Sequence, residues 1–221
     1  VNCVGILNEN CDKNVLNAIY INSIIPHKIA ELIKDSNTKL IHLSTDCVFK
    51  GDNPPYNEKS IRDSTTIYGK TKSLGEIDDD KNLTIRTSII GPDLNLNGIG
   101  LFNWFMKQKG SMNGFTNVIW NGITTITLAK SIEKMLNKDY TGIYHLVSEK
   151  SISKYELCRI FAKVFNRDKL EIIPFDKIKS NKTLKNSISK NKKIIIPDYL
   201  EMINEMRSWI NAHNYLYWYI Y

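Results

Sequence analysis

The chain alternates between short apolar runs and segments with apolar residues at helical spacing, which is the pattern of an α/β fold. Short apolar runs of the kind buried in a parallel sheet predict strands at residues 1–7, 39–44, 82–87 and 142–147, with a further extended segment at 117–120. Helical spacing predicts helices at residues 14–34, 66–79, 101–107, 125–136, 153–165 and 197–213. We therefore expect a Rossmann-like, doubly wound parallel sheet with a smaller C-terminal lobe.

Local signals refine these elements. Pro26 should kink or restart the first helix, because proline cannot donate the backbone hydrogen bond that a helix needs. Ser153 is followed three residues later by Glu156, which predicts a capping box. Residues 51–64 are rich in Gly, Pro, Asn and Asp and predict a loop, and residues 177–193 are polar and predict irregular structure. We expect the aromatic tail, residues 215–221, to dock on the body.

Charge and cysteine content narrow the classes of protein. The formal charge of +7 comes from lysines that are spread along the chain, which favours a solvated surface over a nucleic-acid site and suits an anionic small molecule. Four scattered cysteines without metal-ligand spacing predict neither disulfides nor a metal site. The sequence contains no apolar run of membrane length and no signal-peptide pattern, so we expect a soluble, cytoplasmic protein that binds no membrane.

The strongest chemical signal is Tyr68-Gly-Lys-Thr-Lys72. On a helix, tyrosine and lysine four residues apart share a face, and a nearby ammonium should lower the pKa of the phenol so that it can exchange a proton with a substrate oxygen. Taken alone this spacing is common and usually marks a surface contact. Its context changes the interpretation, because Ser44-Thr45-Asp46 lies at a predicted strand end and Gly75-Glu76 follows the lysine.

The string Ser-Thr-Asp-Cys-Val-Phe-Lys-Gly from Ser44, Pro-Tyr-x-Glu from Pro55, and Tyr-Gly-Lys-Thr-Lys-x-x-Gly-Glu from Tyr68 closely resembles the dTDP-4-dehydrorhamnose reductases. These form a branch of the extended short-chain dehydrogenase/reductases. The resemblance covers essentially the whole chain and is densest between Leu40 and Glu76. It implies NAD(P)H-dependent reduction of a 4-keto-6-deoxy nucleotide sugar in surface polysaccharide or glycan precursor synthesis.

The resemblance also implies roles for individual residues. Thr45 would hold the reacting carbonyl, Tyr68 would donate the proton, Lys72 would bind the nicotinamide ribose and tune Tyr68, and Asn22 would support them. The other cofactor contacts implied are Cys3, Val4, Gly5, Ser44 and Arg86. The substrate contacts implied are Thr45, Asp46, Cys47, Thr87, Asn117, Trp120 and Asn121. The cofactor would be NADP or NAD, with NADPH preferred, and a homodimer is an open alternative to a monomer.

The domain boundaries follow from this assignment. We expect residues 1–88 and 118–147 to form the NAD(P)-binding body, and residues 89–117 and 148–221 to form the substrate lobe. The glycine-rich phosphate turn of the family is absent from the sequence, and we expect that about 60 residues of a typical family member precede Val1. Phosphate recognition is therefore not assigned to any residue here.

Cys47 stands where many of these reductases carry tyrosine. This departure, together with the amide and aromatic residues between Asn113 and Thr125, leads us to expect a UDP-linked 2-acetamido sugar rather than a dTDP-linked one. Two alternatives stay open. One is a related epimerase or dehydratase, although the residues after Asp46 supply no acid or base for elimination. The other is a non-catalytic nucleotide-binding subunit like the regulatory partner of methionine adenosyltransferase.

Overall fold

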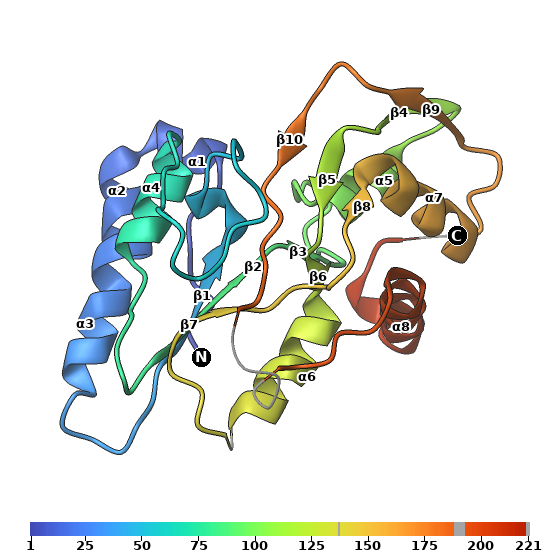
Figure 1. The fold of residues 1–221 in the computed structure, drawn as a ribbon. Coiled ribbons are helices and arrows are strands. Elements are labelled where there is room, and N and C mark those ends of the chain that lie inside the picture. The colour runs from blue at the N-terminus through green and yellow to red at the C-terminus, as the bar shows by residue number, and fades with distance from the viewer. Residues whose placement is uncertain (137, 188–192, 220–221) are drawn as a thin grey trace. The chain divides into compact units, whose positions relative to one another are not determined.

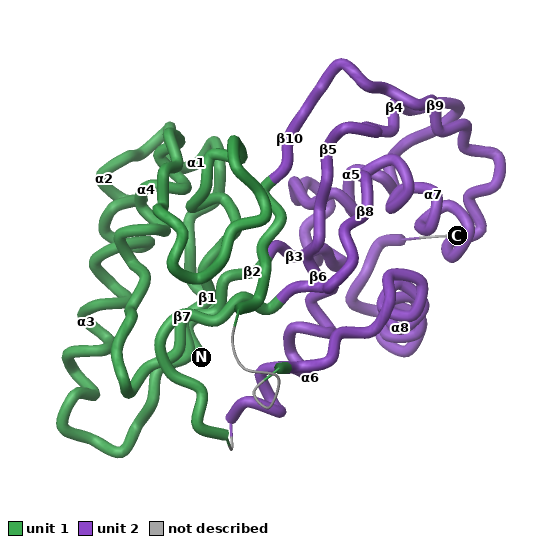
Figure 2. The backbone as a smooth tube through the Cα atoms, in the orientation of Figure 1, with its two compact units in different colours: residues 1–87, 137–146, 182–193 green, residues 88–136, 147–181, 194–221 purple. Residues whose placement is uncertain are grey.

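The computed structural model describes residues 1–136, 138–187 and 193–219. The chain forms two compact units, each built from three separate stretches of sequence (Figure 2). Unit 1 comprises Val1–Thr87, Asn137–Leu146 and Lys182–Lys193, and unit 2 comprises Ser88–Leu136, Val147–Asn181 and Ile194–Tyr221. This division differs from the expected one at residues 118–136, which lie with unit 2, and at residues 182–193, which lie with unit 1.

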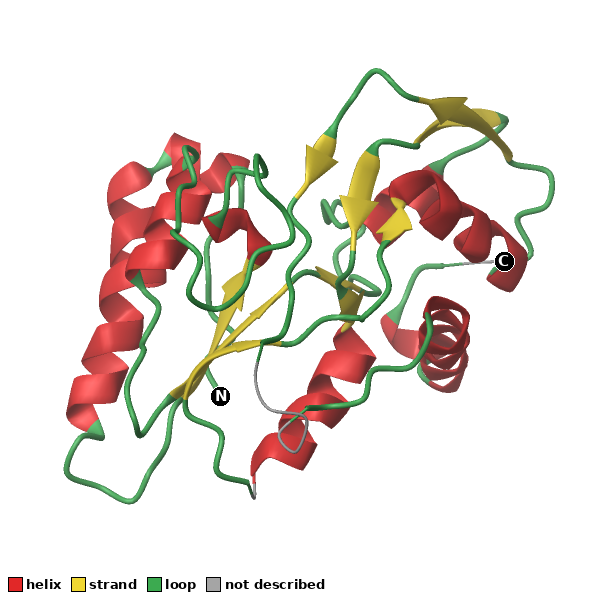
Figure 3. Ribbon diagram, in the orientation of Figure 1, coloured by secondary structure: helices red, strands yellow, loops and turns green. Residues whose placement is uncertain are grey.

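Unit 1 is organised around a parallel sheet. Strands β1 (Ile41–Thr45), β2 (Leu83–Thr87) and β7 (Gly142–His145) pair in the order β1-β2-β7, with Thr45 beside Thr87 in register. The helical elements of this unit are α1 (Glu9–Lys13), α2 (Val15–Ile19), the π-helical turn η1 (Tyr20–Ile24), α3 (Ile25–Leu32), the 3₁₀ turn η2 (Asp46–Val48) and α4 (Ile67–Leu74). Figures 1 and 3 show α2, α3 and α4 grouped on one side of this sheet. Parallel pairing aligns the carboxyl ends of the strands at one edge.

Unit 2 contains short strands packed with helices. Its helices are α5 (Leu101–Lys107), α6 (Thr125–Leu136), α7 (Lys154–Val164), α8 (Tyr199–Ala212) and the 3₁₀ turn η4 (Asn214–Leu216). Its strands are β3 (Ile89–Ile90), β4 (Ser111–Phe115), β5 (Val118–Trp120), β6 (Ile123–Thr124), β8 (Ile152–Ser153), β9 (Glu171–Phe175) and β10 (Ser180–Asn181). The pairs β3–β6, β4–β9 and β5–β10 are parallel, and β5–β8 is antiparallel. The predicted α/β class with parallel sheets is confirmed.

Several local predictions are confirmed. The Ser153–Glu156 capping box is present at the start of α7. The restart expected at Pro26 is present as a change of helix type, because the π-helical turn η1 ends directly before α3, which contains Pro26 in its first turn. In the tail, Tyr219 is buried and its hydroxyl bonds Asp93 and Asn103, so this part docks within unit 2. Residues 220–221 lie outside the described part of the chain.

Other predictions need correction. The buried strand expected at residues 1–7 is wrong: the segment makes one isolated bridge, Asn2 with His42, and the Val1 and Val4 side chains are 63% and 60% exposed. The helix expected at 66–79 ends at Leu74, because Gly75 closes it. Strand β7 ends at His145, two residues short of the expected bound. Of the irregular segment 177–193, Ser180–Asn181 pairs as β10, and residues 188–192 are outside the described chain. No helix among the described residues has the length and apolar character needed to cross a membrane.

Candidate active site

Thr45 occupies the carboxyl end of β1 with an extended backbone. Its hydroxyl accepts a hydrogen bond from the Cys47 amide at 3.1 Å and donates to Asp46 Oδ1 at 3.1 Å, which starts the turn η2. The neighbouring Ser44 donates its hydroxyl to Glu76 Oε1 at 2.6 Å. Hydrogen bonds therefore fix the side chains of both Ser44 and Thr45 at the end of β1. In open α/β sheets, ligands bind at the carboxyl ends of the strands, which is where Thr45 lies.

Helix α4 brings Tyr68 and Lys72 onto one face. Thr66 caps its N-terminus by accepting from the Gly69 amide at 3.1 Å. A Cβ built on Gly69 would lie 2.1 Å from the Cys47 carbonyl oxygen, and one built on Gly75 would lie 1.9 Å from the Asn22 carbonyl oxygen. The two glycines are thus the points where α4 touches η2 and η1. This close approach explains why the motif has glycine at both positions.

We expect Gly69→Ala to destabilise unit 1 by about 1–3 kcal/mol, because the added methyl overlaps backbone that cannot move aside cheaply. Urea unfolding followed by far-ultraviolet circular dichroism measures the change. Gly100→Ala is the control, since its added Cβ meets nothing within 4 Å. Equal stability of the two variants would contradict the close contact.

The titration expected for Tyr68 is reversed. Burial, followed by the nearby Cys47, raises the pKa of Tyr68, and an interaction with Thr45 lowers it only partly. The expectation that Lys72 lowers the pKa of the phenol is wrong for this structure. The reason is geometric, because Lys72 Nζ turns toward β1 and donates to the Leu43 carbonyl at 2.7 Å. Tyr68 therefore holds its proton.

Burial likewise governs the titration of Lys72 and Cys47. It lowers the pKa of Lys72 to about 8, against the opposing field of Glu76. It raises the pKa of the Cys47 thiol to about 11, with Asp46 adding to the effect. Cys47 thus stays a neutral thiol near neutral pH, in keeping with a packing role.

Asn22 ties the N-terminal segment to the site. Its Oδ1 accepts from the Ile6 amide at 2.8 Å, and its Nδ2 donates to the Ile6 carbonyl at 2.9 Å and to Thr71 Oγ1 at 3.1 Å. The Gly5 position faces this group, since a Cβ there would lie 3.4 Å from Asn22 Oδ1 and 4.0 Å from Lys72 Nζ. Both polar atoms of the Asn22 side chain are therefore engaged in hydrogen bonds that hold residues 3–6 beside α4.

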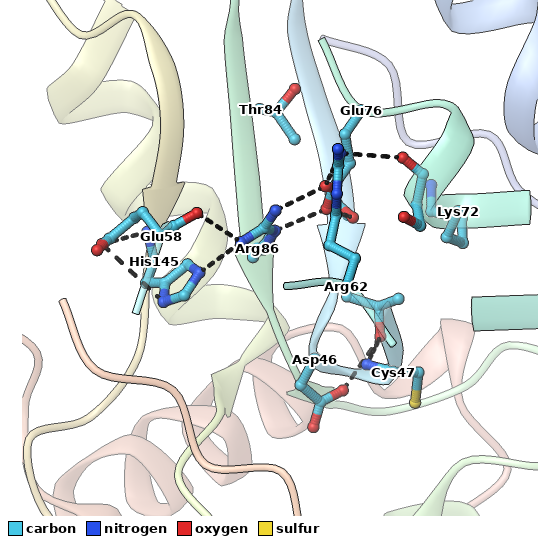
Figure 4. Close-up of polar contacts among 12 residues, drawn as sticks. Asp46, Cys47, Glu58, Arg62, Lys72, Glu76, Thr84, Arg86 and His145 are labelled. Carbon is cyan, nitrogen blue, oxygen red and sulfur yellow. Dashed lines mark hydrogen bonds and ion pairs between the residues drawn. The ribbon is translucent and has the colours of Figure 1, made fainter. Parts of the chain in front are cut away.

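A buried ion pair between Arg86 and Glu76 lies behind Ser44. Arg86 on β2 donates to both oxygens of Glu76, at 2.7 Å from Nε and 2.8 Å from Nη2, and Arg62 adds a bond of 3.0 Å. Figure 4 shows the Arg86 guanidinium between Glu76 on one side and Glu58 and His145 on the other. Burial would raise the pKa of Glu76, but its bonds to Arg86 and the arginine charge hold that pKa below its usual value.

This network changes the interpretation of Arg86. The residue was expected to contact the cofactor, but its guanidinium also donates to the Glu58 carbonyl at 3.2 Å and faces His145 Nε2 at 3.1 Å. The Arg86 side chain is fully buried, and its donors point into unit 1. Glu76 stood in the quoted motif, and its spacing from Lys72 was the one available signal. Glu58 is the glutamate of the Pro-Tyr-x-Glu motif, whereas no sequence feature pointed to His145.

The predicted substrate residues divide between the units. Thr45, Asp46, Cys47 and Thr87 lie together at the strand ends of unit 1, where Thr87 is buried beside Thr45 in register. Asn117, Trp120 and Asn121 lie in unit 2. There the Trp120 indole donates to Ser88 Oγ at 2.8 Å, the Asn121 amide to the Ser148 carbonyl at 3.2 Å, and the Asn117 amide to the Asp176 carbonyl at 2.9 Å. These donors are engaged inside their own unit.

A hollow of about 900 Å³ in unit 1 is lined by residues of η1 and α3, by Lys34, and by Ile77 and residues 79–82. It includes Asn82, which precedes β2, and none of Thr45, Tyr68 or Lys72. The hollow therefore belongs to the amino-end side of β2 and not to the candidate site. Among the described residues, His, Cys, Asp and Glu form no group of three or more that could hold a metal ion.

Comparison with known proteins decides the family. The family model described as the RmlD substrate binding domain matches residues 8–194. The chain belongs to this family. The resemblance found in the sequence to dTDP-4-dehydrorhamnose reductases is therefore confirmed.

Individual relatives show the extent of the likeness. The dTDP-4-keto-6-deoxy-D-glucose reductase of Streptomyces niveus is 25% identical over 170 residues, which cover 73% of this chain and 59% of that protein. The methionine adenosyltransferase 2 subunit beta of Xenopus laevis is 25% identical over 162 residues, or 67% of this chain and 48% of that protein. The chain thus spans about half to three-fifths of these relatives.

Solved structures of the family share the fold. The dTDP-4-dehydrorhamnose reductase of Bacillus anthracis, crystallised in complex with NADP, superposes with a TM-score of 0.80 at 21% identity and covers 94% of this chain and 78% of its own. The Rossmann-like class of the RmlD-family chain is thereby confirmed.

Proposed function

We propose that this RmlD-family chain takes part in NAD(P)H-dependent reduction of the 4-keto group of a nucleotide-linked 4-keto-6-deoxy sugar. The observation that carries the proposal is that α4, which bears Tyr68 and Lys72 one helical turn apart, packs at Gly69 against the turn that follows Thr45 at the carboxyl end of β1. In the proposal unit 1 is the cofactor body and unit 2 the substrate lobe.

The chain's own residues would manage the proton. Tyr68 keeps its proton because burial raises its pKa, so the phenol can act as the acid when the carbonyl oxygen gains negative charge. Thr45 would supply a second hydroxyl by turning its proton from Asp46 Oδ1, to which it donates in the structure, to that oxygen. Proton donation and carbonyl polarisation would thus come from two neighbouring hydroxyls.

A nicotinamide cofactor fits the residues around Lys72. Cys3, Val4 and Gly5 are exposed, and among the described residues the Cys3 and Gly5 amides have no hydrogen-bond partner. Lys72 Nζ lies near the Gly5 position and can donate to ribose hydroxyls. When bound, the dihydronicotinamide would supply the hydride for C4. NADP is favoured by the B. anthracis structure, which was crystallised with it.

The nucleotide of the substrate is a separate question. The expectation of a UDP-linked acetamido sugar depended on amide and aromatic side chains near Trp120, and those of Asn117, Trp120 and Asn121 bond within unit 2. The named activity of the S. niveus relative concerns a dTDP sugar. We therefore propose the dTDP-linked 4-keto-6-deoxy hexose as the preferred substrate, with the UDP-linked 2-acetamido sugar as the rival.

The test supplies the protein with each 4-keto nucleotide and with NADPH or NADH. Loss of dihydronicotinamide absorbance, with the 4-hydroxy product identified by mass spectrometry, is expected for the dTDP sugar. A clear preference for the UDP sugar would reverse the substrate assignment only. Oxidation with neither sugar, together with binding of nucleotide, would refute the reductase and favour the regulatory role suggested by the methionine adenosyltransferase subunit.

We expect Lys72→Met to weaken NADPH binding about tenfold or more and to slow turnover about a hundredfold, because one ammonium serves ribose binding and proton transfer. Fluorescence titration of NADPH and steady-state rates measure the two effects. Lys70→Met is the matched control, since Lys70 is exposed on the same helix. Unchanged NADPH binding in Lys72→Met would remove the ribose role.

A further inference from the structure

The side-chain amide of Asn2 is fixed in one orientation. Its backbone is held against β1, where the Asn2 amide donates to the Ile41 carbonyl at 2.7 Å and the Leu43 amide donates to the Asn2 carbonyl at 3.1 Å. Its Oδ1 accepts from the Val4 amide at 3.1 Å. The amide nitrogen Nδ2 therefore faces His42 Nδ1 at 3.2 Å. A flipped amide would set two donors, Nδ2 and the Val4 N–H, against each other.

This orientation decides the tautomer of His42. Nδ1 must accept from the Asn2 amide, so in a neutral imidazole the proton lies on Nε2. His42 is fully buried, and burial, followed by the charges of Lys72 and His27, lowers its pKa to about 3. The ring is therefore neutral, and its Nε2–H faces Lys72 Nζ at 3.4 Å.

An N–H in this place is a poor neighbour for an ammonium group. Lys72 Nζ already donates one N–H to the Leu43 carbonyl. If Lys72 were protonated, another of its N–H groups would face the Nε2–H of His42, and two donors would oppose each other. A free amine has a lone pair that can accept the His42 Nε2–H instead. Burial also lowers the pKa of Lys72, while Glu76 just after α4, Cys11 on α1 and Cys3 on the N-terminal segment raise it.

We propose that His42 is a positioning residue whose Nε2–H, oriented by Asn2, makes the Lys72 amine give up its proton more readily. In a reductase this would set how Lys72 meets the ribose and Tyr68, a consequence that rests on the function proposed above. A chain of hydrogen bonds also runs from the Val4 amide through the side chains of Asn2 and His42 to Lys72. The segment proposed to lie against the cofactor is thus hydrogen-bonded to the lysine that serves it.

Asn2→Asp tests the link with almost no change of shape. The introduced carboxylate can still accept from Val4, but it offers His42 Nδ1 an acceptor where the amide offered a donor. The His42 proton should then move to Nδ1, and Nε2 should become an acceptor for an ammonium. We expect the Lys72 pKa to rise from about 8 toward the ordinary lysine value.

The measurement is nitrogen nuclear magnetic resonance of the protein with labelled histidine and lysine, without cofactor or substrate. The wild-type His42 signal should show Nε2 protonated and Nδ1 bare, and the reverse tautomer would overturn the proposal without any variant. In Asn2→Asp, a shifted tautomer with an unmoved Lys72 titration would overturn it as well.

Two controls separate the hydrogen-bond link from the added charge. Asn10→Asp places the same charge on an exposed position of α1 and should leave the His42 tautomer unchanged. In the double variant Asn2→Asp with His42→Leu, the rise in the Lys72 pKa should shrink to the part caused by charge alone. An equal rise with and without His42 would refute its role. The spectra are recorded without turnover, so they test the role of His42 even if neither 4-keto sugar is a substrate.

Discussion

Tyr68→Phe should lower turnover about a hundredfold to ten-thousandfold while leaving nucleotide-sugar binding nearly intact. The substitution removes one hydroxyl and little contact area, so the loss would fall on proton donation. Burial favours the neutral phenol of Tyr68, so its side chain carries a proton to donate. Steady-state rates with the 4-keto nucleotide and NADPH, together with calorimetric binding of the sugar nucleotide, measure the two parts.

Tyr20→Phe is the matched control, because the Tyr20 side chain is 43% exposed on η1. It removes the same atom from the same unit and should leave the rate unchanged. A Tyr68→Phe enzyme that keeps turnover within about threefold of wild type would exclude Tyr68 as the proton donor.

Glu76→Gln should destabilise unit 1 by about 3–5 kcal/mol. The amide keeps the shape of the carboxylate, but the buried Arg86 guanidinium loses its counter-charge and one acceptor becomes a donor. Hydrogen exchange of the β1 and β2 amides reports the stability of this unit directly. Asp52→Asn, which breaks the exposed Lys50–Asp52 pair, should change it little.

The same pair has a pH signature. Since the pKa of folded Glu76 is depressed, its contribution is fully present above the unfolded-state pKa and is lost as the pH falls through the folded value. Glu76→Gln should therefore flatten the loss of stability in acid. Adding Arg86→Met should recover part of the lost stability, because no unpaired charge would remain. A Glu76→Gln protein as stable as wild type at neutral pH would show that the pair is not a structural support.

The features that the sequence predicted correctly depend on residues that are only a few positions apart. Tyr68 and Lys72 share a helix face through their four-residue separation, and the Ser153 capping box required only the residues of one turn. Thr45 was located because strand ends in a parallel sheet fall at one edge. The family resemblance extended these local signals to the fold, and the RmlD-family match confirmed it.

The remainder depended on contacts between distant residues. Pairing of β4 with β9 joins residues about 60 apart, and short strands of mixed composition carry little sign of their partner. The direction of the Lys72 side chain was decided by the Leu43 carbonyl and His42, which no spacing within α4 reveals. The apolar residues of segment 1–7 suggested burial, yet its placement follows from the amides of Asn2 and Asn22.

The return of residues 183–187 to unit 1 has a consequence for biosynthesis. Leu184 bridges Tyr56, and Ser187 donates its amide to Glu58 at 3.1 Å, so the loop that contributes Glu58 is completed only by residues near the C-terminal end of the sequence. A ribosome that has released the chain only as far as residue 150 would expose a sheet whose third strand is present but whose Tyr56 and Glu58 lack these partners. Pauses or premature stops between residues 150 and 183 should therefore leave nascent chains that are captured by chaperones, even though all of Thr45, Tyr68 and Lys72 have already been made.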